Sequence, residues 1–141
     1  MQYQEFITKV QEETGADTYQ DAEEITRATL STLGERLYRT EREQLASQLP
    51  EELKAFLLSR QEAEPTTRQH TERYPLQEFY NRVGARSDAG YYDAAERAKA
   101  VISVLQQAVS AGQMEKVMDS LPDEYHDLLD RSQGPGFPSL G

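Results

Sequence analysis

The chain has 141 residues, 37% of them apolar and 28% charged, which suits a single folded domain with a sizeable core. Its formal charge of −10 argues against nucleic acid and anionic membranes as partners, because both are bound largely through Lys and Arg. The absence of cysteine excludes disulfides, thiolate catalysis and cysteine-bound metals.

The first predicted helix begins at Tyr3 and stops at Gly15. Phe6, Ile7 and Val10 follow Tyr3 at helical spacing, which is typical of a short amphipathic helix. A longer helix is predicted from Asp21, because its carboxylate can accept a backbone N–H as an N-cap while Glu24 reaches back to it. Its buried stripe is predicted to comprise Ile25, Thr29, Leu33 and Leu37.

A third, short helix is predicted from Thr40, and it buries Leu45 and Leu49. The fourth begins at Pro50, because proline suits a first helical turn and the acids that follow meet the positive end of the helix dipole. Its predicted inward residues are Leu53, Phe56 and Leu57. Residues 60–73 contain no apolar side chain larger than alanine, and we interpret them as a polar connector.

The same four elements are predicted again after the connector. They begin at Pro75, at Asp93 with its Glu96, near Gly112 and at Pro122, and the first of them stops at Gly84. Their predicted inward residues are Leu76, Phe79, Tyr80, Val83, Ala94, Ala98, Val101, Ile102, Leu105, Val109, Met114, Val117, Leu121, Tyr125, Leu128 and Leu129. Residues 131–141 are rich in Gly and Pro, which predicts a tail without regular structure.

The two halves match each other in sequence. An offset of 72 residues aligns residues 19–57 with 91–129 without a gap, and 12 of the 39 positions are identical. At an offset of 73, Glu5, Phe6 and Val10 also match their counterparts. The sequence therefore predicts an all-α fold, a tandem duplication of a four-helix unit, with about eight helices in a compact bundle-like array. The predicted parts are a first helical repeat (1–59), the polar connector (60–73), a second helical repeat (74–130) and the Gly/Pro-rich C-terminal tail (131–141).

No motif points to catalysis or to a cofactor. Asp123 and His126 have the spacing at which a helical carboxylate and imidazole can share a metal. The matching residues of the first half are Glu51 and Lys54, and a lysine ammonium has no lone pair to offer. Glycine-rich phosphate loops and nucleophile motifs are also missing. We therefore predict no catalytic residue, no cofactor and no metal site.

Aromatic and apolar residues near helix starts and in the tail are the candidates for contact with a partner. Tyr19 and Tyr91 precede the predicted Asp caps, where a ring either fixes the entry of the chain into the helix or forms a contact surface. Tyr92 adds a second ring. In the tail, Phe137 and Leu140 belong to a Phe-Pro-Ser-Leu sequence that either frays or serves as a docking peptide. The candidate partner contacts are therefore Tyr91, Tyr92, Phe137 and Leu140.

Three sequence features resemble domain-of-unknown-function family 2267 over about residues 3–129. They are the acid-Ala-x-Glu start of both long helices, the Leu-Pro-acid-Glu turn at 49–52 and 121–124, and the Glu-Phe-x-x-x-Val at 5–10. The resemblance implies a bacterial, cytosolic helical protein of doubled architecture. It carries over no catalytic residue, because the family has no established activity.

The sequence leaves three interpretations of function open. The first is a non-enzymatic protein-interaction or scaffold module whose partner is another protein or a second copy. The second is a small-ligand-binding protein or enzyme with a pocket at the repeat interface, which predicts a closed, partly apolar cavity with converging polar groups. The third is an acidic metal-binding or stress-related protein. A cytoplasmic location is expected, because no leader-like segment and no membrane-length apolar run is visible.

Overall fold

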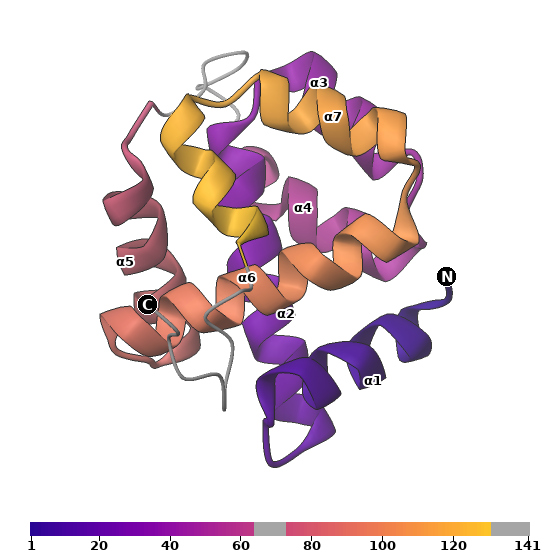
Figure 1. The fold of residues 1–141 in the computed structure, drawn as a ribbon. Coiled ribbons are helices and arrows are strands. Elements are labelled where there is room, and N and C mark those ends of the chain that lie inside the picture. The colour runs from indigo at the N-terminus through magenta and orange to yellow at the C-terminus, as the bar shows by residue number, and fades with distance from the viewer. Residues whose placement is uncertain (64–72, 131–141) are drawn as a thin grey trace.

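The computed structural model describes residues 1–63 and 73–130. Within these ranges the chain forms seven α-helices, one 3₁₀-helix and no strand (Figure 1). They are, in order, α1 (Tyr3–Thr14), α2 (Tyr19–Arg36), α3 (Arg39–Ala46), α4 (Glu51–Ala63), α5 (Leu76–Ser87), α6 (Tyr91–Ala108), α7 (Ala111–Asp119) and η2 (Asp123–Leu129). The predicted all-α class, with eight helices in a compact fold, is confirmed.

Two long helices organise the fold. The helices α2 and α6 have 18 residues each, and Figure 1 shows α6 crossing in front of α2. The shorter α1 and α5 each pack against both of them, α4 packs against α2, and η2 packs against α6. The helices α3 and α7 contact each other at one end of the molecule. The helices α1, α4, α5 and η2 are therefore held by one or both of the long helices, and the contact between α3 and α7 joins the two halves.

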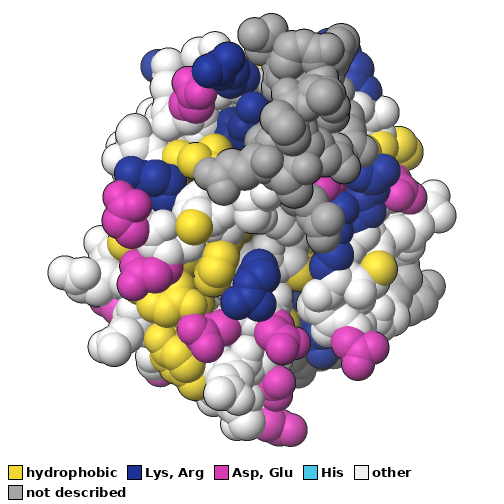
Figure 2. Space-filling view, turned by 180° about the vertical axis from the view of Figure 1, so that it is seen from behind, with side chains coloured by type: hydrophobic (Ala, Val, Ile, Leu, Met, Phe, Trp, Pro, Cys, Tyr) yellow, Lys and Arg dark blue, Asp and Glu magenta, His cyan; other side chains and the backbone are white. Residues whose placement is uncertain are grey.

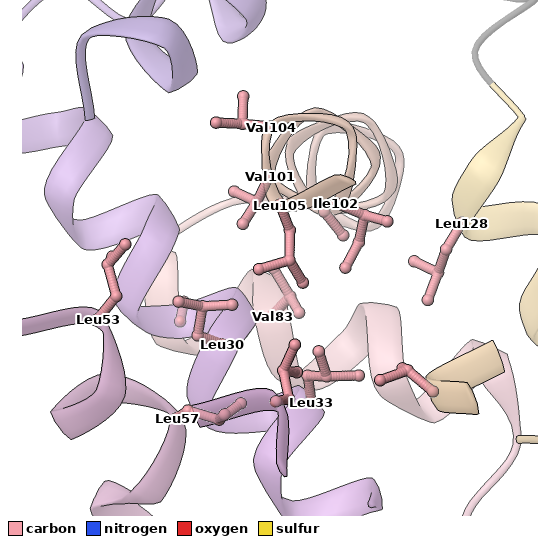
Figure 3. Packing of buried hydrophobic residues seen from close by; sticks show 14 of the residues in the cluster. Leu30, Leu33, Leu53, Leu57, Val83, Val101, Ile102, Val104, Leu105 and Leu128 are labelled. Carbon is pink, nitrogen blue, oxygen red and sulfur yellow. The ribbon is translucent and has the colours of Figure 1, made fainter. Parts of the chain in front are cut away.

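One apolar core runs through both halves of the chain. In Figure 3, Leu105 on α6 points toward Leu30 and Leu33 on α2, whereas Val104 points to the other side of α6. All four side chains are almost inaccessible to solvent, so α6 is buried on both of these faces. The predicted stripe of α2 is confirmed, and it consists of Ile25, Thr29, Leu33 and Leu37. Burial of this kind contributes about 25 cal/mol per Å² of apolar surface removed from water.

The two long helices begin earlier than predicted. The N-cap of α2 is Thr18, whose Oγ1 accepts a hydrogen bond from the Asp21 backbone N–H at 3.0 Å. Asp21 therefore lies inside the first turn, and the prediction that it is the cap is wrong. Asp93 occupies the corresponding place in α6, which starts after Gly90 without a side-chain cap. In both helices the acid still stabilises the first turn through the helix dipole.

The short helices also depart from some predicted ends. The helix α3 starts at Arg39 rather than at Thr40, and its cap makes no side-chain hydrogen bond. The helix α1 ends at Gly15, which has a φ of 73°, as predicted. The helix α5 runs past Gly84 and ends at Asp88. A Cβ on Gly84 would lie 2.7 Å from the Ala89 carbonyl oxygen, so this glycine permits a tight turn after the helix rather than ending it.

The fourth element differs between the halves. The helix α4 is an α-helix of 13 residues, whereas η2 is a 3₁₀-helix of 7 residues. A 3₁₀-helix has three residues per turn, so Tyr125 and Leu128 share its buried face. Leu129 lies a third of a turn further on and is 37% exposed. The prediction that Leu129 points inward is therefore wrong, although the matching Leu57 in α4 is fully buried.

Candidate functional site

A groove open to solvent lies between the end of α6, α7 and η2. It has a volume of about 390 Å³, and we call it the α7–η2 groove. More of its exposed lining is apolar than polar. Its lining residues are Gln106, Ala111, Met114, Glu115, Met118, Asp119, His126 and Leu129.

The wall formed by α7 is fixed at its start. The Ser110 hydroxyl caps the helix by accepting from the Gln113 backbone N–H at 3.1 Å. The Gln48 side chain, which follows α3, accepts from the Ser110 backbone N–H at 2.8 Å. Met114 and Met118 lie one turn apart on this helix, are both buried, and belong to the lining of the groove.

The wall formed by η2 is fixed by polar side chains. The Tyr125 hydroxyl, which is fully buried, donates to the Tyr74 carbonyl oxygen at 2.6 Å. The Glu124 carboxylate accepts from the Leu76 backbone N–H at 3.1 Å and so satisfies a donor at the start of α5. The Tyr80 hydroxyl donates to Asp127 at 2.8 Å. These bonds hold η2 in place and keep Leu129 on the edge of the groove.

The groove is acidic at its edge. Glu115 and Asp119 line it, His126 is exposed beside them, and no Lys or Arg is among the lining residues. Apolar walls beside carboxylates suit an occupant that combines large apolar side chains with a positive charge.

A second, more polar pocket of about 380 Å³ lies where the α1–α2 and α5–α6 turns meet. Its lining includes the carboxylates of Asp17, Asp21, Glu24 and Asp88. The Arg97 guanidinium, also in the lining, donates to the Ser87 carbonyl oxygen at 2.9 Å and is thereby tied to α5. This pocket sits between the halves, but its half-open, polar character differs from the closed, partly apolar cavity expected of an enzyme or ligand carrier.

A buried polar cluster joins α2, α5 and η2, and we call it the Glu35 cluster. Glu35 is 5% exposed and binds Arg86 at 2.9 Å and Arg82 at 3.1 Å. The Tyr74 hydroxyl donates to the same carboxylate at 3.2 Å, and the Arg82 guanidinium lies 4.1 Å from the centre of the Tyr74 ring. The cluster comprises Glu35, Arg36, Tyr74, Arg82, Arg86 and Tyr125.

Each group of the Glu35 cluster that we describe has a partner within the protein. The Arg36 Nε donates to the Tyr74 carbonyl oxygen at 3.0 Å, and its guanidinium lies over the Tyr125 ring. Burial raises the pKa of Tyr74 and of Tyr125 above the ordinary value, and the Glu35 charge raises that of Tyr74 further. The hydrogen bond from Arg82 lowers the pKa of Glu78. The cluster is a structural tie between helices, because its polar groups are used within the fold.

Aromatic side chains also meet on the side that carries α1. Seen from behind, apolar side chains gather toward the lower left, with charges of both signs among them (Figure 2). Tyr3 packs edge-on against Phe56 and donates to Glu23 at 2.5 Å, while Arg27 lies over the Phe56 ring. Burial, together with the Glu23 hydrogen bond, raises the pKa of Tyr3. These contacts are made within the fold.

The structure tests the sequence-based site residues only in part. Tyr91 and Tyr92 form the first turn of α6, but their side chains lie outside the described residues, as do Phe137, Leu140 and His70. Asp123 and His126 are both exposed on η2. In residues 1–63 and 73–130, no group of three or more His, Cys, Asp or Glu is placed to hold a metal ion.

Sequence reasoning missed both the groove and the Glu35 cluster. Thr32, Glu35 and Arg36 stand at helical spacing on α2 and are all buried, so this helix is buried on a polar side as well as on its apolar stripe. A Glu-Arg pair followed by arginines on a later helix is a weak signal for such a cluster. The groove gives no sequence signal, because it depends on the 3₁₀ geometry of η2.

The comparisons place this all-helical fold in a family. Residues 3–128 match the model of the uncharacterized conserved protein family DUF2267. The chain belongs to this family, and the resemblance seen in the capping and turn motifs is confirmed. Among proteins with curated descriptions, none matches this chain. Among the helices described, none has both the length and the apolar character needed to cross a membrane.

Proposed function

We propose that the chain is a protein-interaction module that binds a short segment of a partner protein in the α7–η2 groove. The observation that carries this proposal is a solvent-open groove of about 390 Å³ whose apolar lining includes Leu129, still 37% exposed. A single exposed leucine is ordinary. A leucine at the edge of a concave apolar surface, however, gains burial when a partner side chain enters, at about 25 cal/mol per Å².

The partner segment carries large apolar side chains next to Lys or Arg. Apolar groups suit the walls, and the positive charge complements Glu115 and Asp119. Met114 and Met118 support this use, because unbranched, polarizable methionine side chains adapt to differently shaped apolar groups. The overall charge of −10 favours the same partner chemistry and disfavours nucleic acid and anionic membranes.

We also infer that the chain is a tandem duplication whose second half has become the binding half. In support, 12 of 39 aligned positions are identical, and both halves run through four elements in the same order. Met114 aligns with Arg42, which is buried and donates to the Gly34 and Leu37 carbonyl oxygens. Leu129 aligns with the fully buried Leu57. At the second of these positions the first half buries its leucine, whereas the second half leaves Leu129 37% exposed at the groove.

The test uses an array of synthetic peptides of about ten residues, a length that spans about 15 Å as a helix. The peptides combine zero, one or two large apolar residues with zero, one or two Lys or Arg. Binding to the wild-type chain should increase with both apolar and basic content. The variant Leu129→Asp should weaken the best peptide about tenfold or more, since about 1.4 kcal/mol is a factor of ten.

The matched control is Tyr38→Asp. Tyr38 is 40% exposed, lies outside the groove and has Arg73 over its ring, so this variant introduces the same charge at a similarly exposed large side chain. It should bind the peptides as the wild type does. Equal loss in both variants would point to charge alone, and unchanged binding in Leu129→Asp would refute the groove as the binding site.

A further inference from the structure

We infer that the chain supplies an occupant for its own groove: Phe137 and Leu140, in residues 131–141, dock in the α7–η2 groove of the same molecule. We call residues 131–141 the tail segment. This inference rests on the proposed function, because it assigns to the same groove a competitor that the partner peptide must displace. Three arguments support the inference: the chemical complementarity of the tail segment and the groove, the short distance between them along the chain, and the high local concentration that results.

The first step is chemical complementarity. The large apolar side chains of the tail segment are Phe137 and Leu140, and its one charged side chain is Arg131. The groove is complementary to these side chains. Its walls around Met114 and Met118 are apolar, and the carboxylates of Glu115 and Asp119 lie at its edge. The tail segment therefore has the composition that the groove favours in a partner.

The second step is reach. Leu129 lines the groove and stands two residues before the tail segment begins. The eight residues from Leu129 to Phe137 span up to about 26 Å, at about 3.3 Å each. The nine residues of α7 form a wall only about 13 Å long, at about 1.5 Å each. Gly134 and Gly136 lie in this stretch and permit the sharp change of direction that a return to the groove requires.

The third step is local concentration. A short connection holds an attached ligand at an effective concentration in the range of about 1 mM. A contact with a dissociation constant of about 0.1 mM would then be about 90% occupied. A partner peptide that competes with the tail segment would bind about tenfold more weakly than it would bind an empty groove. The reason is that only the molecules with an empty groove can bind the peptide. Loss of the tail contact should raise peptide affinity by about this factor.

Methionine NMR tests the inference directly on the full chain. The chain has three methionines: Met114 and Met118 line the groove, and Met1 lies outside it as an internal reference. With the methionine methyl groups ¹³C-labelled, Phe137→Leu removes an aromatic ring while keeping an apolar side chain. A docked ring makes the Met114 or Met118 signal move, with Met1 unchanged. Gln133→Ala, a control in the same segment, should leave all three signals in place.

A double variant separates the inference from the proposed function. In Phe137→Ala/Leu140→Ala the groove signals should move further, a synthetic peptide of residues 131–141 should move them back, and array peptides should bind about tenfold more tightly. The tail substitutions can leave the Met114 and Met118 signals unchanged while array peptides still shift these signals. In that case the tail segment is not the occupant, and the proposed function stands. If the tail substitutions move the signals but no array peptide binds the double variant, this inference stands and the proposed function fails.

Dilution identifies the molecule that provides the tail segment. Docking within one molecule leaves the groove signals independent of protein concentration over about a hundredfold range, because the effective concentration is set by the connection. Signals that revert to the double-variant positions on dilution would show that a second copy provides the segment, and would overturn docking in the same molecule.

Discussion

The Glu35 cluster makes a strong prediction for stability. Glu35→Gln keeps the size of the side chain but removes the charge that faces Arg82 and Arg86. Removing one partner of a fully buried ion pair costs about 3 to 5 kcal/mol. Here Glu35 is 5% exposed while Arg82 and Arg86 are 28% and 19% exposed, so water can reach the arginines in part. We therefore expect a loss of about 2 to 3 kcal/mol in the free energy of unfolding.

Urea denaturation followed by far-ultraviolet circular dichroism at neutral pH measures this loss. The control is Glu43→Gln, which removes an exposed carboxylate paired with Arg39 at 2.9 Å and should change stability by less than about 0.5 kcal/mol. Adding Arg86→Met to Glu35→Gln should recover part of the loss, because the unpaired guanidinium is removed. Equal small effects of Glu35→Gln and Glu43→Gln would refute the view that the cluster ties α2 to α5.

Two further predictions concern the core and the buried tyrosine. Leu33→Ala and Leu105→Ala, at 1% and 0% exposure, should each cost about 2 to 5 kcal/mol, and denaturation showing under about 1 kcal/mol for both would contradict the shared core. Because burial raises the pKa of Tyr74, the unfolded chain loses this proton first, so stability should fall as pH rises above about 10. In Tyr74→Phe the urea midpoint should decrease less steeply with pH between about pH 8 and about pH 11 than in the wild type. The same dependence on pH in both proteins would contradict the raised pKa of Tyr74.

The sequence predicts the helices well because their apolar residues repeat at helical spacing. The stripe of Ile25, Leu33 and Leu37 on α2 needs no knowledge of its neighbours, since each side chain must be removed from water on one face. Helix ends are predicted less well because they depend on competing local contacts. Thr18 rather than Asp21 caps α2, and Gly84 serves a close backbone approach rather than a helix end.

The groove could not be predicted because it arises from a change of helix type. The sequence of residues 121–129 resembles that of 49–57, so it predicts a helix with Leu129 inside. Tyr125 and Leu128 instead share the buried face of a 3₁₀-helix. This geometry is held by contacts to Tyr74 and Leu76, which lie far away in the sequence. The candidate contacts Tyr91, Tyr92, Phe137 and Leu140 stay predictions.

Because the two halves are similar in sequence, α1 and α5 are rival helices for the place beside Glu35. With α1 in the place of α5, Lys9 and Glu13 would stand where Arg82 and Arg86 now stand, at the offset of 73. Glu35 would then face one cation and one further carboxylate instead of two cations, with little water to screen the repulsion. The correct helix is thus distinguished from its look-alike by charge. Charge at this contact therefore favours α5 over α1 as the neighbour of Glu35.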